Sequence, residues 1–186
     1  MSEEKLLKNL MSLTNGIDAC LERKLKGPAL ILVYSTIDTA GWLDTDQSFT
    51  TRQAFINWTE KYLLTSKPLA CDAIDLFAAR CGLLHTFTPD SQLSVDGKAR
   101  RLCYAWGTAK VADIQRLIDL TNGNKTYAAV HVDDLYEALK LGLLAFIDDV
   151  ANDHQRNVRV TAKAKKFFSE WDVESVDELI AAIDNS

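Results

Sequence analysis

The chain has 186 residues, of which 47% are hydrophobic and 25% are charged. This length and balance are typical of one globular domain with a buried core, and they exclude a largely disordered protein. The formal net charge of -5 argues against a protein that coats duplex nucleic acid with a broad cationic surface. It does not exclude a small RNA site.

The sequence shows no pattern typical of an export signal, a membrane span or a zinc site. The N-terminal residues MSEEKLLKNLMSL carry acids and lysines instead of the apolar core of a signal peptide. The longest apolar run, residues 29–37, ends at Asp38 and is far shorter than the roughly 20 residues that span a bilayer. The four cysteines form no Cys-x-x-Cys pair, which indicates reduced thiols. We therefore predict a cytoplasmic protein with no metal, no other cofactor and no membrane association.

Apolar residues recur at helical spacing through the first half of the chain. Gly27-Pro28, a polar stretch after Asp44 and Lys67-Pro68 interrupt this spacing, and Pro89 follows its last segment. The pattern predicts helices over residues 2–24, 28–43, 51–64 and 69–87. Four helices with short connections favour an antiparallel bundle.

The second half begins with a different pattern. Residues 100–107 and 126–132 have strand character, residues 110–123 have helical spacing, and Asp96-Gly97 is a turn signal. We predict a small α/β insertion over about residues 94–132.

A long amphipathic helix follows the insertion, with Asp133 or Asp134 as its N-cap, and it is expected to rejoin the bundle. Residues 156–186 form a basic and then acidic C-terminal extension, with a last helix over 173–184. The predicted fold is therefore mainly α, an antiparallel helical bundle with a small α/β insertion, in a single domain over residues 1–186.

The end of the fourth helix contains an arginine and a histidine within the segment RCGLLH, residues 80–85. On a helical wheel, His85 falls on the apolar stripe and Arg80 lies about 140° away. The two side chains therefore share a groove if the long Arg80 side chain reaches round the helix, if the helix loosens near Gly82, or if a second chain supplies one of them.

Two interpretations of this pair are open. In the structural one, His85 is a core or helix-end histidine and Arg80 pairs with Asp38, whose carboxylate needs a partner in an apolar helix. In the functional one, the histidine moves a proton at an RNA 2′-hydroxyl or at the leaving oxygen. The arginine holds the phosphate while negative charge grows on it, and the pair needs no metal.

Arg80-Cys81-Gly82-Leu83-Leu84-His85, late in an apolar helix, resembles the HEPN family (higher eukaryotes and prokaryotes nucleotide-binding), whose motif is arginine, four to six residues and histidine. The resemblance implies a helical bundle, often a homodimer with two motifs in one cleft. It also implies a metal-independent endoribonuclease or RNA-binding protein of a bacterial toxin or defence type, with an antitoxin or regulatory partner. Arg80 would then bind phosphate and His85 would be the acid/base residue.

One departure from the family keeps a second function open. Catalytic members often carry a polar residue directly after the arginine, where this chain has Cys81. The alternative is a non-catalytic helical dimer that acts as an interaction or small-ligand-binding module. A dimer is expected under either function, because Leu76 and Leu83 lie opposite His85 on the motif helix and need cover on a second face.

A second candidate for phosphate binding lies near the C-terminus. The segment RNVRVTAKAKK contains no acid, and it carries the three predicted phosphate-binding residues Arg156, Arg159 and Lys163. The alternative is a solvated strip, or one that its acidic neighbours neutralise.

Overall fold

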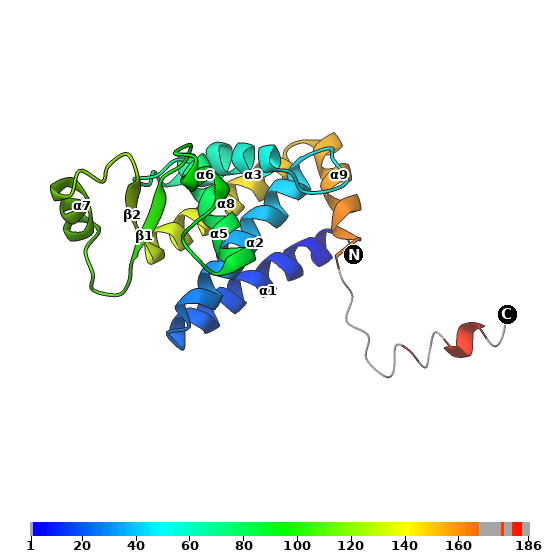
Figure 1. Ribbon diagram of the computed structural model, residues 1–186. Coiled ribbons are helices and arrows are strands. Elements are labelled where there is room, and N and C mark those ends of the chain that lie inside the picture. The colour runs from blue at the N-terminus through cyan, green and yellow to red at the C-terminus, as the bar shows by residue number, and fades with distance from the viewer. Residues whose placement is uncertain (1, 168–175, 177–179, 184–186) are drawn as a thin grey trace.

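The centre of the fold is the apolar helix α2 (Lys26–Asp44), which other helices surround (Figure 1). A computed structural model describes residues 2–167, 176 and 180–183 of the chain. In it, α2 contacts four helices before and after the insertion as well as α1 (Ser2–Glu22), which lies alongside it. Val33, Ile37 and Leu43 of α2 are completely buried. The lack of a polar face on this segment is therefore explained by its central position.

The predicted helix over residues 51–64 is interrupted in the structure. It begins as α3 (Arg52–Trp58), continues as a π-helix, η1 (Thr59–Leu63), and ends as α4 (Leu64–Ser66). The spacing of apolar residues alone does not reveal such a change from α-helical to π-helical hydrogen bonding. The backbone of the later helix α8 (Val132–Ala151) passes close to η1, because a Cβ on Gly142 would lie 3.1 Å from the backbone of Leu63.

The helix with the RCGLLH segment is α5 (Ala73–Thr86), which begins four residues later than predicted. The carboxylates of Asp72 and Asp75 form a capping box with the first-turn amides and so set its start. It ends at Phe87, which has a φ of 55°, and the amide of Thr88 donates to the carbonyl of Gly82. Gly82 has to be glycine here, since a Cβ would lie 2.6 Å from the carbonyl oxygen of Asp90.

The insertion has the predicted α/β character. After the short α6 (Gln92–Val95) come β1 (Arg101–Ala105), α7 (Val111–Leu120) and β2 (Tyr127–His131). The strands are parallel, with Arg101 opposite Tyr127, and α7 connects them at one end of the molecule (Figure 1). Parallel pairing requires such a crossover.

An ion pair between the buried Asp75 and the partly exposed Arg100 connects this insertion to the bundle. Asp75 is 2% exposed and accepts hydrogen bonds from the backbone amide of Arg100 at 2.6 Å and from its Nε at 2.9 Å. The hydroxyls of Tyr34 on α2 and Tyr104 on β1 meet at 2.5 Å. These contacts place β1 against α5 and α2.

The chain then returns to the bundle through α8 (Val132–Ala151) and α9 (His154–Ala164). The prediction of Asp133 or Asp134 as the N-cap of α8 is wrong. The cap is His131, whose Nδ1 accepts from the amide of Asp133 at 3.2 Å, because β2 runs directly into the helix.

The first part of the predicted C-terminal extension belongs to the bundle. Val160 and Ala164 of α9 are buried in the core, and α9 contacts α1, α2 and α8. The predicted helix over 173–184 lies largely outside the described residues.

The predicted fold class, mainly α with a small α/β insertion, is confirmed by these elements. All four cysteines are free thiols. Within the described part of the chain, no helix has both the length and the apolar character to cross a membrane.

Candidate functional site

The structure brings Arg80, His85 and Asp38 together within one chain. Arg80 Nε donates to Asp38 Oδ2 at 2.6 Å, and Arg80 Nη1 lies 3.3 Å from His85 Nε2. Of the three arrangements that the wheel allowed, the long Arg80 side chain reaching round α5 is the one observed. No second chain is needed for the contact.

The predicted pair of Arg80 and Asp38 is confirmed, and it is largely shielded from solvent. The two side chains are 19% and 15% exposed. Burial raises the pKa of Asp38, although the hydrogen bond and charge of Arg80 lower it. Burial opposes the charge of Arg80, but the hydrogen bond and charge of Asp38 outweigh it and raise the pKa of the guanidinium. Asp38 therefore fixes where the arginine lies.

The prediction that His85 belongs to the buried stripe is wrong. His85 is exposed, because it lies in the last turn of α5 and is followed by residues 86–90, which are exposed as well. Arginine can only donate hydrogen bonds, so His85 Nε2 is the acceptor in its contact with Arg80 Nη1. The neutral ring then carries its proton on Nδ1. An exposed imidazole beside a fixed guanidinium has the two groups that phosphodiester chemistry requires.

The sequence argument for a second chain on α5 does not hold. Leu76 is completely buried, and Leu83 packs against the same core within the single chain. The face opposite His85 is covered by neighbouring elements of the bundle, which the helical wheel of α5 alone does not show.

The three cations predicted to bind phosphate lie on α9, beside the end of α2. Arg156 Nε donates to Asp44 Oδ1 at 2.7 Å, and Lys163 Nζ donates to the carbonyl of Trp42 at 2.6 Å. Arg159 forms an ion pair with Asp46 at 2.8 Å. Each cation therefore has a partner at or just after the end of α2. Phosphate binding by these three residues stays a prediction.

Arg156 is the cation of α9 that joins two acids to an aromatic ring. Its Nη1 donates to Asp149 at 3.2 Å, and its Nη2 donates to the hydroxyl of Tyr62. Burial opposes its charge, but the hydrogen bonds that Arg156 donates to Tyr62 and Asp44 outweigh this and raise the pKa of Arg156. Tyr62 reaches this cluster from η1, so the π-helix contributes to the network.

Asp149 provides a test of this network through pH. Hydrogen bonds from Lys61 and Tyr62 lower the pKa of Asp149 from 3.8 to about 2. A carboxylate whose pKa is lower in the folded state stabilises the fold above about pH 4, and this contribution is lost between about pH 4 and pH 2. We expect Asp149→Asn to be less stable than wild type near neutral pH, with a gap that closes toward pH 2.

The measurement is the urea midpoint at a series of pH values. Asp148→Asn, on the exposed neighbouring residue, removes the same charge outside the network and should lower the midpoint less near neutrality. A gap between Asp149→Asn and wild type that stays constant across the acid range would contradict the role given to Asp149.

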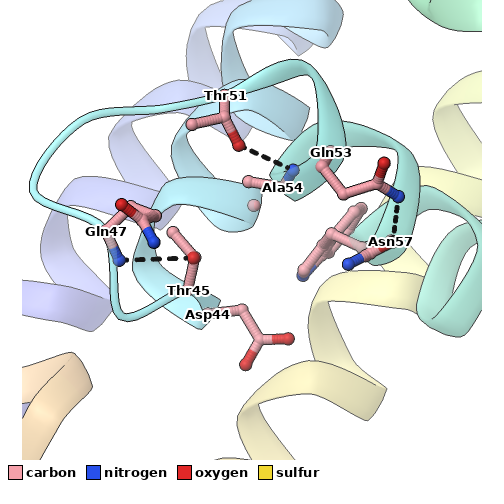
Figure 2. A pocket seen from close by; sticks show the side chains of 9 residues that line it. Asp44, Thr45, Gln47, Thr51, Gln53, Ala54 and Asn57 are labelled. Carbon is pink, nitrogen blue, oxygen red and sulfur yellow. Dashed lines mark hydrogen bonds between the residues drawn. The ribbon is translucent and has the colours of Figure 1, made fainter.

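A pocket of about 440 Å³ lies beside the same end of α2, between the loop that follows it and α3 (Figure 2). Sequence reasoning missed it, because its residues come from separate segments. The available signal was Gln53 and Asn57, two amides four residues apart on one face of a helix. The lining residues are Gly41, Asp44, Thr45, Gln47, Thr51, Gln53, Ala54, Asn57 and Trp58.

No protein-family model, curated protein or solved structure matches this chain. The resemblance to the HEPN family therefore stays a prediction from residues 80–85. The features of the structure that bear on function are the Arg80 and His85 geometry and the pocket.

Proposed function

We propose that the protein is a HEPN-like, metal-independent endoribonuclease of the toxin or defence type. The observation that carries the proposal is the 3.3 Å contact between Arg80 Nη1 and His85 Nε2 at the exposed end of α5. Arg80 supplies a permanent positive charge, and Asp38 positions it through Nε. His85 is open to solvent, so an RNA strand can reach it.

The chemistry follows from these groups. Arg80 binds a phosphate oxygen, which draws its Nη1 away from His85 and frees Nε2. His85 then takes the proton of the 2′-hydroxyl, the 2′-oxygen bonds to phosphorus, and the bond from phosphorus to the 5′-oxygen breaks. A proton from solvent or from a second histidine completes the leaving 5′-hydroxyl. The products are a 2′,3′-cyclic phosphate and a 5′-hydroxyl end.

The test is cleavage of end-labelled single-stranded and hairpin RNAs in the presence of a chelator. We expect wild type to cut and His85→Ala to lose about 100-fold or more in rate, the usual contribution of a positioned acid/base group. His154→Ala, which removes another exposed histidine, is the matched control and should cut like wild type. RNA with a 2′-deoxy group at the cleaved position should resist.

One observation favours a second candidate, a non-catalytic interaction module. The pair between Arg80 and Asp38 is shielded enough to serve structure alone. In that case wild type leaves every RNA intact, and Arg80→Ala lowers stability without another effect. Equal cleavage by wild type and His85→Ala would also refute the proposed chemistry.

A further inference from the structure

The pocket beside α2 is lined by three parts of the chain, and internal hydrogen bonds hold the loop that forms one of its walls. The loop between Thr45 and Thr51 forms one wall and α3 forms another (Figure 2). Trp42 Nε1 donates to the carbonyl of Ser48 at 3.0 Å, which fastens the loop to α2. Thr51 Oγ1 accepts from the amide of Ala54 at 3.1 Å, which fastens its other end to α3. A volume of about 440 Å³ is within the range of small-molecule sites.

The lining consists largely of hydroxyl and amide groups that keep bonding capacity. Gln53 Nε2 donates to Asn57 Oδ1 at 2.6 Å, which leaves Gln53 Oε1 and Asn57 Nδ2 for a ligand. The two hydroxyls of Thr45 and Thr51 accept backbone amides, so each retains a proton to donate. Figure 2 shows Asn57 beside Gln53 on α3 and Asp44 beside Thr45 at the end of α2. A ligand with both donors and acceptors fits such walls.

Unpartnered polar atoms gather around the same place. Among the described residues, the buried side-chain nitrogen and oxygen atoms without a hydrogen-bond partner are Trp58 Nε1, Thr59 Oγ1 and Arg159 Nε. Trp58 lines the pocket, and Thr59 follows it as the first residue of η1. Arg159 Nη2 donates to the carbonyl of Asp44, a lining residue. Buried polar groups are rarely left unpaired, and π-helices are frequent at functional sites.

The charge of the lining selects against ions. Asp44 is the ionisable residue among those that line the pocket, and Arg156 already donates to its Oδ1 from Nε and Nη2. An anion would meet this carboxylate with no lining cation to offset it. A cationic ligand would have to compete with Arg156. An uncharged ligand satisfies the amides and hydroxyls without either cost.

We propose that this pocket binds an uncharged, hydroxyl-rich molecule about the size of a nucleoside. Asn57 and Gln53 provide amide contacts, the Asp44 carboxylate accepts from ligand hydroxyls, and the Thr45 and Thr51 hydroxyls donate. This proposal does not depend on Arg80 or His85, and its test does not use RNA cleavage.

The experiment is a titration of ¹⁵N-labelled full-length protein with uncharged probes, read from the indole N–H signals. Uridine, adenosine, D-ribose and D-glucose separate a nucleoside from a free sugar, and inorganic phosphate represents an anion. The chain has four tryptophans, and Trp58→Phe identifies the signal of Trp58 by its loss. We expect at least one uncharged probe to shift that signal with a dissociation constant of about 1 mM or tighter.

The matched variants are Asn57→Ala and Gln115→Ala. Asn57 is exposed and lines the pocket, whereas Gln115 forms a similar side-chain contact with Asp119 on the distant α7. We expect Asn57→Ala to weaken binding about tenfold, the loss of one good hydrogen bond, and Gln115→Ala to leave it unchanged. The proposal is overturned if no uncharged probe shifts the Trp58 signal, if phosphate alone does so, or if both variants bind like wild type.

Discussion

Replacing Asp75 by alanine is expected to lower the free energy of unfolding by about 4 kcal/mol, because it removes a buried carboxylate that accepts several hydrogen bonds. The Asp75 side chain is 2% exposed and receives Arg100 Nη2 at 2.6 Å in addition to the two hydrogen bonds described above. It also accepts the amide of Asp72 in the capping box at 3.3 Å. Alanine removes the acceptor for all four donors. The loss should separate β1 from α5 as well as fray the start of α5.

Asp90→Ala provides the matched control for this experiment. Asp90 pairs at 2.5 Å with Arg101, which directly follows Arg100 in the chain. The Asp90 side chain, however, is 57% exposed. A surface pair of this kind contributes roughly 1 kcal/mol or less. Urea unfolding followed by circular dichroism measures both variants. Similar losses for Asp75→Ala and Asp90→Ala would show that burial does not distinguish the two pairs.

Replacing Arg156 by methionine is expected to cost about 3 kcal/mol, the second largest effect. Its side chain is 11% exposed, and its removal leaves the Asp44 carboxylate without the guanidinium that compensates it. Methionine retains much of the aliphatic volume against Tyr62 and Phe146, whose rings the guanidinium contacts. The cost therefore reports lost charge pairing more than lost packing.

Two further variants make this prediction specific. Arg159→Met removes a cation whose partner Asp46 is 79% exposed, and it should cost about 1 kcal/mol or less. Asp44→Asn in the Arg156→Met background should recover part of the loss, because the uncompensated charge disappears. If the α9 cations serve phosphate instead of the fold, Arg156→Met should leave stability in phosphate-free buffer close to wild type.

Local patterns were sufficient for the helices and for the kind of insertion. Helical spacing places α1, α2, α5 and α8 close to their observed positions. Each of these helices buries at least one face, and that face carries apolar residues at helical spacing. The alternation of strand and helix signals between residues 94 and 132 predicts the two strands and α7 correctly. The differences between the predicted and observed helices are local. A capping box makes α5 begin later than predicted, a histidine caps α8, and a π-helix interrupts the segment after Trp58.

The pairings that build the sites depend on residues far apart in the chain. Arg156 meets Asp44 across 112 positions, and Arg100 meets Asp75 across 25. The pair between Arg80 and Asp38 was predictable because a carboxylate in an apolar helix requires a cation. The other two pairs were not, since many exposed acids and bases were equally available as partners.

The sequence by itself determined that this protein is mainly helical with an α/β insertion, and it singled out Arg80, His85 and Asp38. The tertiary structure alone decided that Arg80 contacts both of the others, that His85 is exposed, and that the α9 cations hold the end of α2 beside a polar pocket. The physical reason is that periodicity reports which face of a helix is buried. How far that burial extends along the helix, and which charges meet there, depends on the packing of the whole chain.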